Sequence, residues 1–397
     1  ESVSREIGIL SALNYSYDDR YLADLSYRAS ASSRFGQDKR WGQFWSAGIG
    51  WNFHKEHFME QAEWLKQFKL RASTGYTGAQ NFNPYQALAM FSYHQTQAYD
   101  NWLGSYLMTL PNDDLKWQKT QDYNVGFDLN LWGRLMIAYD YYVQQTKDQL
   151  LALTIPPSMG FTSYMENIGS TENKGMELKL YDVEKDRYLS TSFSIAKNTN
   201  KLKKISNALR SYNDEVDNDI LEGNTNRPQT RFIEGSSMNA IWAVRSLGID
   251  PANGKEMFLD KSGKRTYDWN ADDYVAYATT DPGLYGNLGL GIFYKGFSLN
   301  TYLNYSLGEK AYNQTLVDRV ENADKHYNCD RRVLVDRWHN PGDETFFKDV
   351  KDASVTRPTS RFVQKNNYLN MTSLNVAYEF DGRLLEPLRI KYLKLAF

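Results

Sequence analysis

Cysteine is almost absent from this sequence, since Cys329 is the single cysteine among 397 residues. One cysteine excludes a disulfide bond within the chain and any metal site made of several cysteines. Long apolar runs are also missing, and a membrane-spanning helix needs a stretch of about 18 apolar residues. The formal net charge is only -2, and no Lys/Arg-rich patch with interleaved aromatics stands out, so nucleic acid is not an expected partner.

A signal peptide is absent as well, because Glu1, Ser2 and Val3 lead directly into an alternating segment. We therefore expect that the chain starts after processing or inside a longer protein. No linker rich in proline, glycine or serine divides it, so residues 1–397 are interpreted as one domain or part of one.

Aromatic residues, by contrast, are abundant and make up 15% of the chain, with 29 Tyr, 19 Phe and 10 Trp. The mean hydropathy of -0.64 at first argues against a membrane protein. A transmembrane β-barrel accounts for the low mean hydropathy, because its lumen and loops are polar. Its tyrosines and tryptophans favour the two membrane–water interfaces.

Residues 123–143 show the pattern that recurs along the chain. Apolar side chains occupy every second position from Tyr123 to Leu131, and again from Leu135 to Val143 after the two-residue turn Trp132-Gly133. Because successive side chains of a strand point to opposite faces, each arm has one apolar face and one polar face. The segment is therefore predicted to be an antiparallel hairpin.

The same pattern predicts about twelve strands. They lie near residues 3–17, 20–33, 42–54, 66–78, 117–131, 134–147, 173–182, 187–198, 284–294, 297–308, 368–380 and 388–397. The gap at 199–283 contains Ala240–Leu247, which also alternates and is interpreted as part of a loop rather than as a thirteenth strand.

The connections between these strands alternate in length. Short ones lie at Asp18-Asp19-Arg20, 54–65, Trp132-Gly133, Asp182–Asp186, Lys295-Gly296 and Asp381–Pro387, and long polar ones at 34–41, 79–116, 148–172, 199–283 and 309–367. In an up-and-down barrel every second connection lies on the same rim, and outer-membrane barrels place their long loops outside. The sequence therefore predicts an all-β fold, a transmembrane antiparallel up-and-down β-barrel with long extracellular loops.

A series of motifs in the same order resembles the SusC/RagA family of TonB-dependent outer-membrane transporters. The matching stretches are Tyr21-Leu22, Ser32-Ser33-Arg34-Phe35-Gly36, Trp41-Gly42-Gln43-Phe44, Ile49-Gly50-Trp51, 70–78, 115–120, Asn167-Ile168-Gly169, 173–177, Gly248-Ile249-Asp250-Pro251, Arg337-Trp338-His339-Asn340-Pro341-Gly342-Asp343 and Ser360-Arg361-Phe362. They span roughly residues 20–397, so the resemblance covers almost the whole chain.

The resemblance implies a function as well as a fold. It implies active import of bulky nutrients, oligosaccharides or oligopeptides, across the outer membrane of a Gram-negative bacterium. It also implies a SusD-like surface lipoprotein as partner, contact with outer-membrane lipid, and energy from the TonB complex through an N-terminal region.

This chain departs from the family pattern in three respects. The plug domain and the TonB-binding segment of the family are not recognisable in it. The family barrel belongs to the plugged 22-stranded class, whereas about twelve strands are predicted here. We therefore expect a partial barrel, a fragment without the plug, the first strands and the last strands.

The sequence contains no strong signature of a catalytic, metal-binding or phosphate-binding site. His54-Lys55-Glu56-His57 lacks the H-E-x-x-H order of zinc proteases and is interpreted as a polar turn. Asp214, Glu215, Asp217 and Asp219 lack the EF-hand spacing and are interpreted as a solvated acidic loop. Gly283, Gly286, Gly289 and Gly291 lack a phosphate-loop spacing and are interpreted as part of a strand. We predict no catalytic residue, no metal and no cofactor, and hence no enzyme.

Aromatic residues in the loop 79–116 are the best candidates for ligand contact. Tyr99, Trp102 and Tyr106 could stack on the apolar faces of sugars or on peptide side chains. They could equally pack the loop onto the barrel mouth, and this second interpretation is favoured because long ordered loops need a core of their own.

Two further functions stay open at this point. A complete small barrel of about twelve strands would act as a passive diffusion pore. An outer-membrane structural or adhesion subunit would use the barrel only as an anchor for its loops.

Overall fold

A computed structural model describes residues 3–80, 82–84, 86–100, 102–154, 160–161, 163–182, 189–223, 225–324, 326–381 and 385–397. The chain divides into two compact units. The sheet unit comprises Glu1–Leu209, Leu284–Tyr305 and Leu369–Phe397, and the loop unit comprises Arg210–Gly283 and Ser306–Tyr368. That residues 1–397 form one barrel-type domain remains a prediction.

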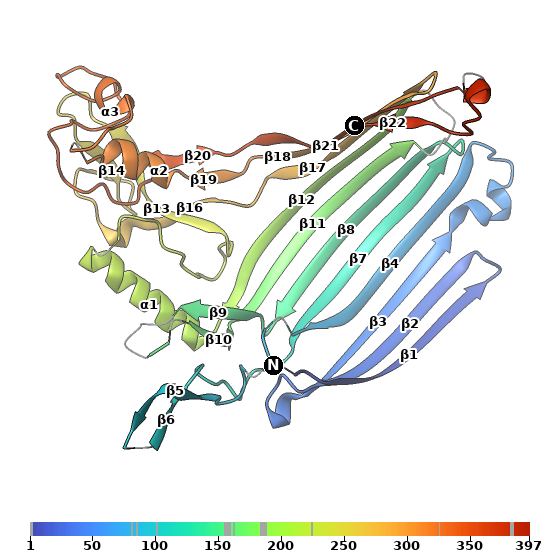
Figure 1. The fold of residues 1–397 in the computed structure, drawn as a ribbon, viewed down its shortest axis with the longest axis horizontal. Coiled ribbons are helices and arrows are strands. Elements are labelled where there is room, and N and C mark those ends of the chain that lie inside the picture. The colour runs from blue at the N-terminus through green and yellow to red at the C-terminus, as the bar shows by residue number, and fades with distance from the viewer. Residues whose placement is uncertain are drawn as a thin grey trace. The chain divides into compact units, whose positions relative to one another are not determined.

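The sheet unit contains one large antiparallel sheet of twelve strands whose neighbours follow each other along the chain (Figure 1). The strands are β1 Glu6–Tyr17, β2 Tyr21–Ser32, β3 Trp41–Asn52, β4 Leu65–Ala79, β7 Gln118–Leu131, β8 Leu135–Lys147, β11 Gly169–Asp182, β12 Leu189–Ile205, β17 Leu284–Tyr294, β18 Phe297–Leu307, β21 Tyr368–Glu379 and β22 Lys394–Ala396. The twelve predicted strands are confirmed, although β12 extends beyond the prediction to Ile205 and β22 is shorter than predicted.

Short turns join the strands at one end of this sheet. Asp18 and Asp19, Trp132 and Gly133, and Lys295 and Gly296 all have φ between 46° and 84°. Positive φ at both central residues is the requirement of a two-residue hairpin whose twist matches its strands. The predicted turns there are confirmed. Of the expected turns Asp182–Asp186 and Asp381–Pro387, residues 183–186 and 382–384 lie outside the described residues.

The main sheet has two faces of opposite character. Across β2, β3, β4, β7 and β8 the register places Ala23, Ile49, Ala72, Val125 and Tyr141 in one row. Ile49 and Val125 are nevertheless 66% and 60% exposed. A continuous exposed apolar surface of this kind is what a barrel presents to lipid. We call this side the apolar face and the opposite side the polar face.

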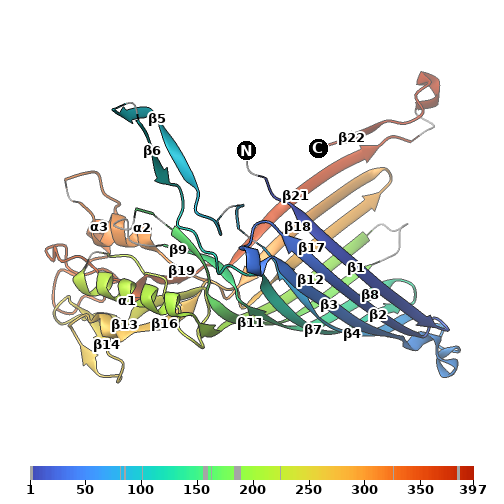
Figure 2. The same ribbon diagram turned by 90° about the horizontal axis from the view of Figure 1, so that it is seen from below.

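The long connections of the sheet unit carry two small hairpins. β5 Phe91–Tyr99 pairs with β6 Trp102–Leu107, and β9 Leu150–Thr154 pairs with β10 Ser163–Asn167. The β5–β6 hairpin extends away from the main sheet in both views (Figure 2). Nearby loop segments have an apolar core of their own, formed by Phe35, Phe44, Phe82, Ala87, Leu115 and Trp117.

The loop unit is built from the two longest connections. β13 Ala240–Ile249, β14 Glu256–Leu259, β15 Arg265–Thr266 and β16 Tyr274–Thr279 form a four-stranded sheet, and β19 Lys310–Tyr312 pairs with β20 Val363–Lys365. Ala240–Leu247 is therefore a strand, but it lies outside the main sheet. This agrees with the interpretation that it belongs to a long connection and is not a thirteenth strand of the barrel.

Helices of the loop unit pack on two apolar cores. The helix α1 Asn207–Glu222 contributes Val216 and Ile220 to a core with Trp242 and Phe258. A second core surrounds α2 Gln314–Leu316, the π-helix Val317–Glu321 and α3 Arg332–Val335. Among the described residues, no helix is both long enough and apolar enough to cross a membrane.

Candidate functional site

The polar face of the main sheet carries a charged cluster at its centre. Arg71 on β4 donates from Nε to Asp128 Oδ2 on β7 at 2.9 Å, and its Nη1 lies 2.8 Å from Asp140 Oδ1 on β8. The register places Gly126 between Arg71 and Asp140. A Cβ at Gly126 would lie 2.6 Å from Asp140 Oδ1, so glycine is required for the three strands to share this ion pair.

Uncharged polar groups continue this face toward β12. The Tyr142 hydroxyl lies over Gly175 and donates to Asn198 Oδ1 at 3.3 Å. Asn200 Nδ2 donates to Asn173 Oδ1 at 2.8 Å. Amide side chains offer both donors and acceptors without charge, so this wall suits neutral polar ligands such as sugar hydroxyls or peptide groups.

The turn between β3 and β4 contains a buried carboxylate, Glu56. Glu56 Oε1 accepts from Trp51 Nε1 at 2.9 Å and from the Tyr21 hydroxyl at 2.8 Å, and these bonds lower the pKa of Glu56. His54 Nδ1 lies 3.2 Å from the Phe68 carbonyl, and His57 Nδ1 lies 2.9 Å from Glu60 Oε1. No group of three metal-ligating side chains occurs among the described residues.

The other two sequence candidates also have structural roles. Asp214, Glu215, Asp217 and Asp219 lie on α1, so the interpretation as an acidic loop is wrong, and Asp217 pairs with Arg231 at 2.6 Å. The helix forms because its apolar positions Val216 and Ile220 recur at helical spacing. Gly286, Gly289 and Gly291 lie in β17, as predicted, whereas Gly283 lies just before its first residue; the Tyr305 hydroxyl covers Gly286.

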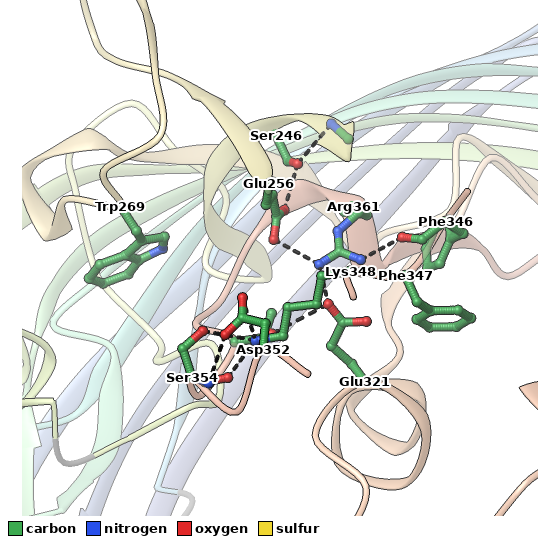
Figure 3. Close-up of polar contacts among 12 residues, drawn as sticks. Ser246, Glu256, Trp269, Glu321, Phe346, Phe347, Lys348, Asp352, Ser354 and Arg361 are labelled. Atoms are coloured by element: carbon green, nitrogen blue, oxygen red, sulfur yellow. Dashed lines mark hydrogen bonds and ion pairs between the residues drawn. The ribbon is translucent and has the colours of Figure 1, made fainter. Parts of the chain in front are cut away.

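Three buried charged side chains of the loop unit meet at Arg361 (Figure 3). Its Nη2 lies 2.7 Å from Glu256 Oε2 and 2.7 Å from Glu321 Oε1, and these three side chains are 3%, 8% and 0% exposed. Glu256 comes from the connection after β12, whereas Glu321 and Arg361 come from the connection after β18. The cluster therefore ties the two long connections together.

Further contacts complete the surroundings of Arg361. Nη1 donates to the Phe346 carbonyl at 2.6 Å, and the guanidinium carbon lies 4.5 Å from the centre of the Phe362 ring. Ser246 Oγ donates to Glu256 Oε1 at 2.6 Å. Burial disfavours the charged guanidinium, but attraction to Glu256 and Glu321 outweighs it and raises the pKa of Arg361. Both carboxylates contact the same guanidinium, which offsets part of the cost of their burial.

A second buried cation, Arg337, fixes the backbone around this cluster. It donates from Nη2 to the carbonyls of Val320 and Glu321, and from Nη1 to the Lys348 carbonyl at 3.1 Å. Burial lowers the pKa of Arg337 and that of Lys348. Lys348 Nζ in turn donates to Ser354 Oγ at 2.9 Å. These cations bind backbone and hydroxyl oxygens, which indicates a structural role.

Two motifs that are far apart in the sequence meet in the loop unit. Trp338 Nε1 and the backbone N–H of Gly342 both donate to the Pro251 carbonyl, at 2.9 and 2.8 Å. Asp343 accepts from the backbone N–H groups of Asn340 and His339, which lowers the pKa of Asp343. The stretches 248–251 and 337–343 therefore hold the two long connections together through hydrogen bonds.

The predicted ligand-contact residues lie on the β5–β6 hairpin. Trp102 is 77% exposed and Tyr106 is 49% exposed, and the Tyr106 ring lies 4.9 Å from the ring of His94. Tyr99 is opposite Trp102 in the hairpin register, but its side chain lies outside the described part of the chain. Trp102 and Tyr106 are exposed in this structure, and both ligand contact and packing onto the barrel mouth stay predictions.

Sequence reasoning alone did not find several of the residues that build these clusters. Arg361 belonged to a recognised motif without a role, and Glu256 and Glu321 carried no motif at all. Arg71 also lay inside a recognised motif, but its partners Asp128 and Asp140 follow only from strand register.

Comparisons with known proteins agree with this architecture. The sequence profile described as "TonB dependent receptor-like, beta-barrel" matches residues 2–316. TonB-dependent receptor SusC of Bacteroides thetaiotaomicron is 32% identical over 328 residues, which cover 79% of this chain and 32% of that protein. TonB-dependent receptor P3 of Formosa agariphila is 27% identical, with 98% of this chain and 40% of that protein covered.

A solved structure shows the same fold at lower identity. "Structure of the RagAB peptide transporter" superposes with a TM-score of 0.83 at 22% identity, covering 99% of this chain and 43% of that chain. The chain thus spans less than half the length of the relatives that it matches.

Proposed function

This chain belongs to the β-barrel family of TonB-dependent receptors, and we propose that it works in active import of bulky nutrients, energised by the TonB complex. Its family places it in the outer membrane of a Gram-negative bacterium. The relatives are receptors rather than enzymes.

One observation carries the proposal. The main sheet combines a continuous apolar face, suited to lipid, with a polar face that carries the ion pairs of Arg71 and a stretch of uncharged amide side chains. A wall of this kind lines a passage for large polar molecules. An anchor for external loops would need no such ordered polar face.

The substrate class in our proposal is oligosaccharide or oligopeptide. The neutral wall around Tyr142, Asn173 and Asn198 supports it, because sugar hydroxyls and peptide groups both pair with amides. The likeness to SusC, and to RagA in a complex described as a peptide transporter, supports the same class and a SusD-like lipoprotein as partner.

Within this proposal, Tyr99, Trp102 and Tyr106 contact the substrate. Trp102 and Tyr106 are exposed on a projecting hairpin, where their rings can stack on sugar faces or on peptide side chains. Such a hairpin offers a first contact for a substrate arriving from outside.

The test uses the full-length protein in its native host and compares uptake of labelled oligosaccharides and oligopeptides with and without TonB. We expect uptake of one class to be lost without TonB, and the Trp102→Ala/Tyr106→Ala variant to bind that class roughly tenfold more weakly. The control variant Tyr277→Ala/Tyr327→Ala removes two rings that are 48% and 76% exposed in the loop unit, and should bind normally. Uptake that persists without TonB would indicate a passive pore, and no uptake of either class would indicate an anchor.

A further inference from the structure

Six lysines border the apolar face of the main sheet at the end where the long connections begin. All six are exposed, and they lie on β7, β8, β11 and β12: Lys119, Lys147, Lys174, Lys197, Lys201 and Lys203. We call them the lysine band.

The register brings these like charges together. Lys119 and Lys147 are direct cross-strand partners, an arrangement that is destabilising unless a counter-charge lies close by. Glu172 supplies one such charge, with Lys174 Nζ at 3.2 Å and Lys203 Nζ at 2.9 Å from its Oε1. Among the described residues, Lys119, Lys147, Lys197 and Lys201 have no recorded ion pair. Of the six lysines, only Lys174 and Lys203 therefore have a carboxylate at ion-pair distance among the described residues.

The lysine band follows directly after the apolar face on β11 and β12, and lies a few positions further along on β7 and β8. On β11, Lys174 is the next residue of that face after Met176, and on β12, Lys197 is the next after Ile195. On β7 and β8, Tyr123 and Tyr141 lie between the apolar rows and the lysines. Tyrosines of this kind mark the level of the lipid headgroups, so the lysines lie just beyond that level.

The border between apolar and charged residues also crosses the strands diagonally. Lys197 is in the same register row as Met176 and Tyr141, whereas Lys147 lies several rows further along β8. A diagonal border is expected for a flat membrane surface, because barrel strands tilt by about 35–45° from the membrane normal. The band therefore follows one membrane surface rather than one strand row.

We propose that the lysine band binds the phosphate groups of glycolipids in the outer leaflet. The long connections of an outer-membrane barrel lie on the outer side, so the band meets the outer leaflet. Each lysine stem can lie along the apolar surface while its ammonium group reaches the headgroups. Phosphates bound there would also relieve the repulsion between Lys119 and Lys147. A soluble partner would have to enter the headgroup layer to reach the same surface.

The test measures the glycolipid that stays bound to the full-length protein after extraction from its native outer membrane, by mass spectrometry per protein molecule. We expect the Lys119→Gln/Lys147→Gln/Lys197→Gln/Lys201→Gln variant to retain at least about tenfold less phosphorylated lipid A, since each lysine near an anionic surface contributes about fivefold. The variant with arginine at the same four positions should retain the wild-type amount.

The matched control is Lys255→Gln/Lys261→Gln/Lys264→Gln/Lys351→Gln, which removes the same charge from exposed lysines of the loop unit. It should leave the bound lipid unchanged. If the fourfold glutamine variant fails to assemble, Lys119→Gln/Lys147→Gln alone should give an intermediate loss.

A second arm separates phosphate recognition from general lipid adhesion. The purified protein is mixed with phosphatidylcholine vesicles containing either phosphorylated lipid A or the same lipid A stripped of phosphate. Preference for the phosphorylated form, lost in the glutamine variant, is the expected result. Equal binding of both forms, or unchanged retention by the glutamine variant, would overturn the proposal, and so would full competition by inorganic phosphate alone at the same concentration.

Discussion

At the scale of single residues, Arg361 decides how the loop unit is held together. Its two carboxylate partners are 105 and 40 residues away in the sequence, and all three side chains are almost fully buried. Loss of one member of a buried ionic group leaves the others without compensation. No pattern in the sequence predicts this cluster, because pairing over such distances depends on how the connections fold.

Replacing Arg361 by methionine in the full-length protein should destabilise the loop unit by about 3–5 kcal/mol, since Glu256 and Glu321 would remain buried together. Hydrogen exchange of residues 306–368 reports the change. Arg332→Met, which removes a surface pair with Asp330, serves as the control and should have a much smaller effect. Equal protection in both variants would contradict the role assigned to Arg361.

Asp343 gives a residue-scale prediction for pH. The backbone N–H groups of Asn340 and His339 hold the pKa of Asp343 below its ordinary value, so the folded state binds the proton less well than the unfolded state. Its stabilising contribution is complete above the ordinary Asp pKa of about 4 and is lost as pH falls through the lower folded value. Exchange protection of the Asn340 and His339 amides should therefore fall in acid. In Asp343→Asn the same protection should not vary over that range.

At the scale of elements, strand prediction succeeded where the alternation is long. β7, β8 and β18 carry apolar residues at every second position over most of their length, because one side of the sheet faces lipid. β14, β15, β19 and β20 are only 4, 2, 3 and 3 residues long, too short for alternation to show. The helix α1 was missed because its many acidic residues resemble a solvated loop.

The candidate site was predictable only in part, because contacts between strands depend on their register. Trp102 and Tyr106 were singled out as loop aromatics, and they are exposed, but their substrate contact remains a prediction. The amide side chains of the polar face were not singled out. Asparagines at alternate positions of a strand are common on any solvent-exposed face, so they do not by themselves indicate a binding surface. Only register shows that Tyr142, Asn198 and Asn173 face each other.

Gly126 provides the prediction for a strand. Its Cβ would lie 2.5 Å from the Tyr139 carbonyl oxygen and 2.6 Å from Asp140 Oδ1, so Gly126→Ala must displace β8 or the Arg71 pair. Overpacking of this kind costs about 1–3 kcal/mol. We expect a lower temperature for the loss of heat-resistant gel mobility in the full-length protein.

The control for that experiment is Gly48→Ala on β3, where the nearest atom to the new Cβ would be 3.8 Å away. Its transition temperature should match the wild type. A similar drop of the transition temperature in both variants would contradict this role of Gly126. It would mean that the two glycines affect stability through backbone flexibility and not through the space that Gly126 leaves for the Arg71 ion pair.

At the scale of the whole molecule, the main sheet ends in β1 on one side and β22 on the other. Unpaired backbone groups of a sheet edge cost several kcal/mol each within lipid, so membrane sheets close on themselves. A sheet of this order needs further strands or a closing contact before it can span a bilayer.

Residues 1–397 expressed alone should therefore not insert as a heat-resistant barrel in detergent or lipid. The measurement is gel mobility with and without boiling, beside the full-length protein as the positive control. A shift on boiling for the 1–397 segment would show that the twelve strands close by themselves, and would favour the passive pore.

The loop unit joins two stretches of chain that the β17–β18 hairpin separates. This arrangement limits how the outer loops of related proteins can recombine. Exchange of residues 206–283 alone would separate Glu256 from Arg361 and Pro251 from Trp338. A transplant between relatives must therefore carry both stretches and the hairpin between them, so the smallest exchangeable cassette runs from the end of β12 to the start of β21.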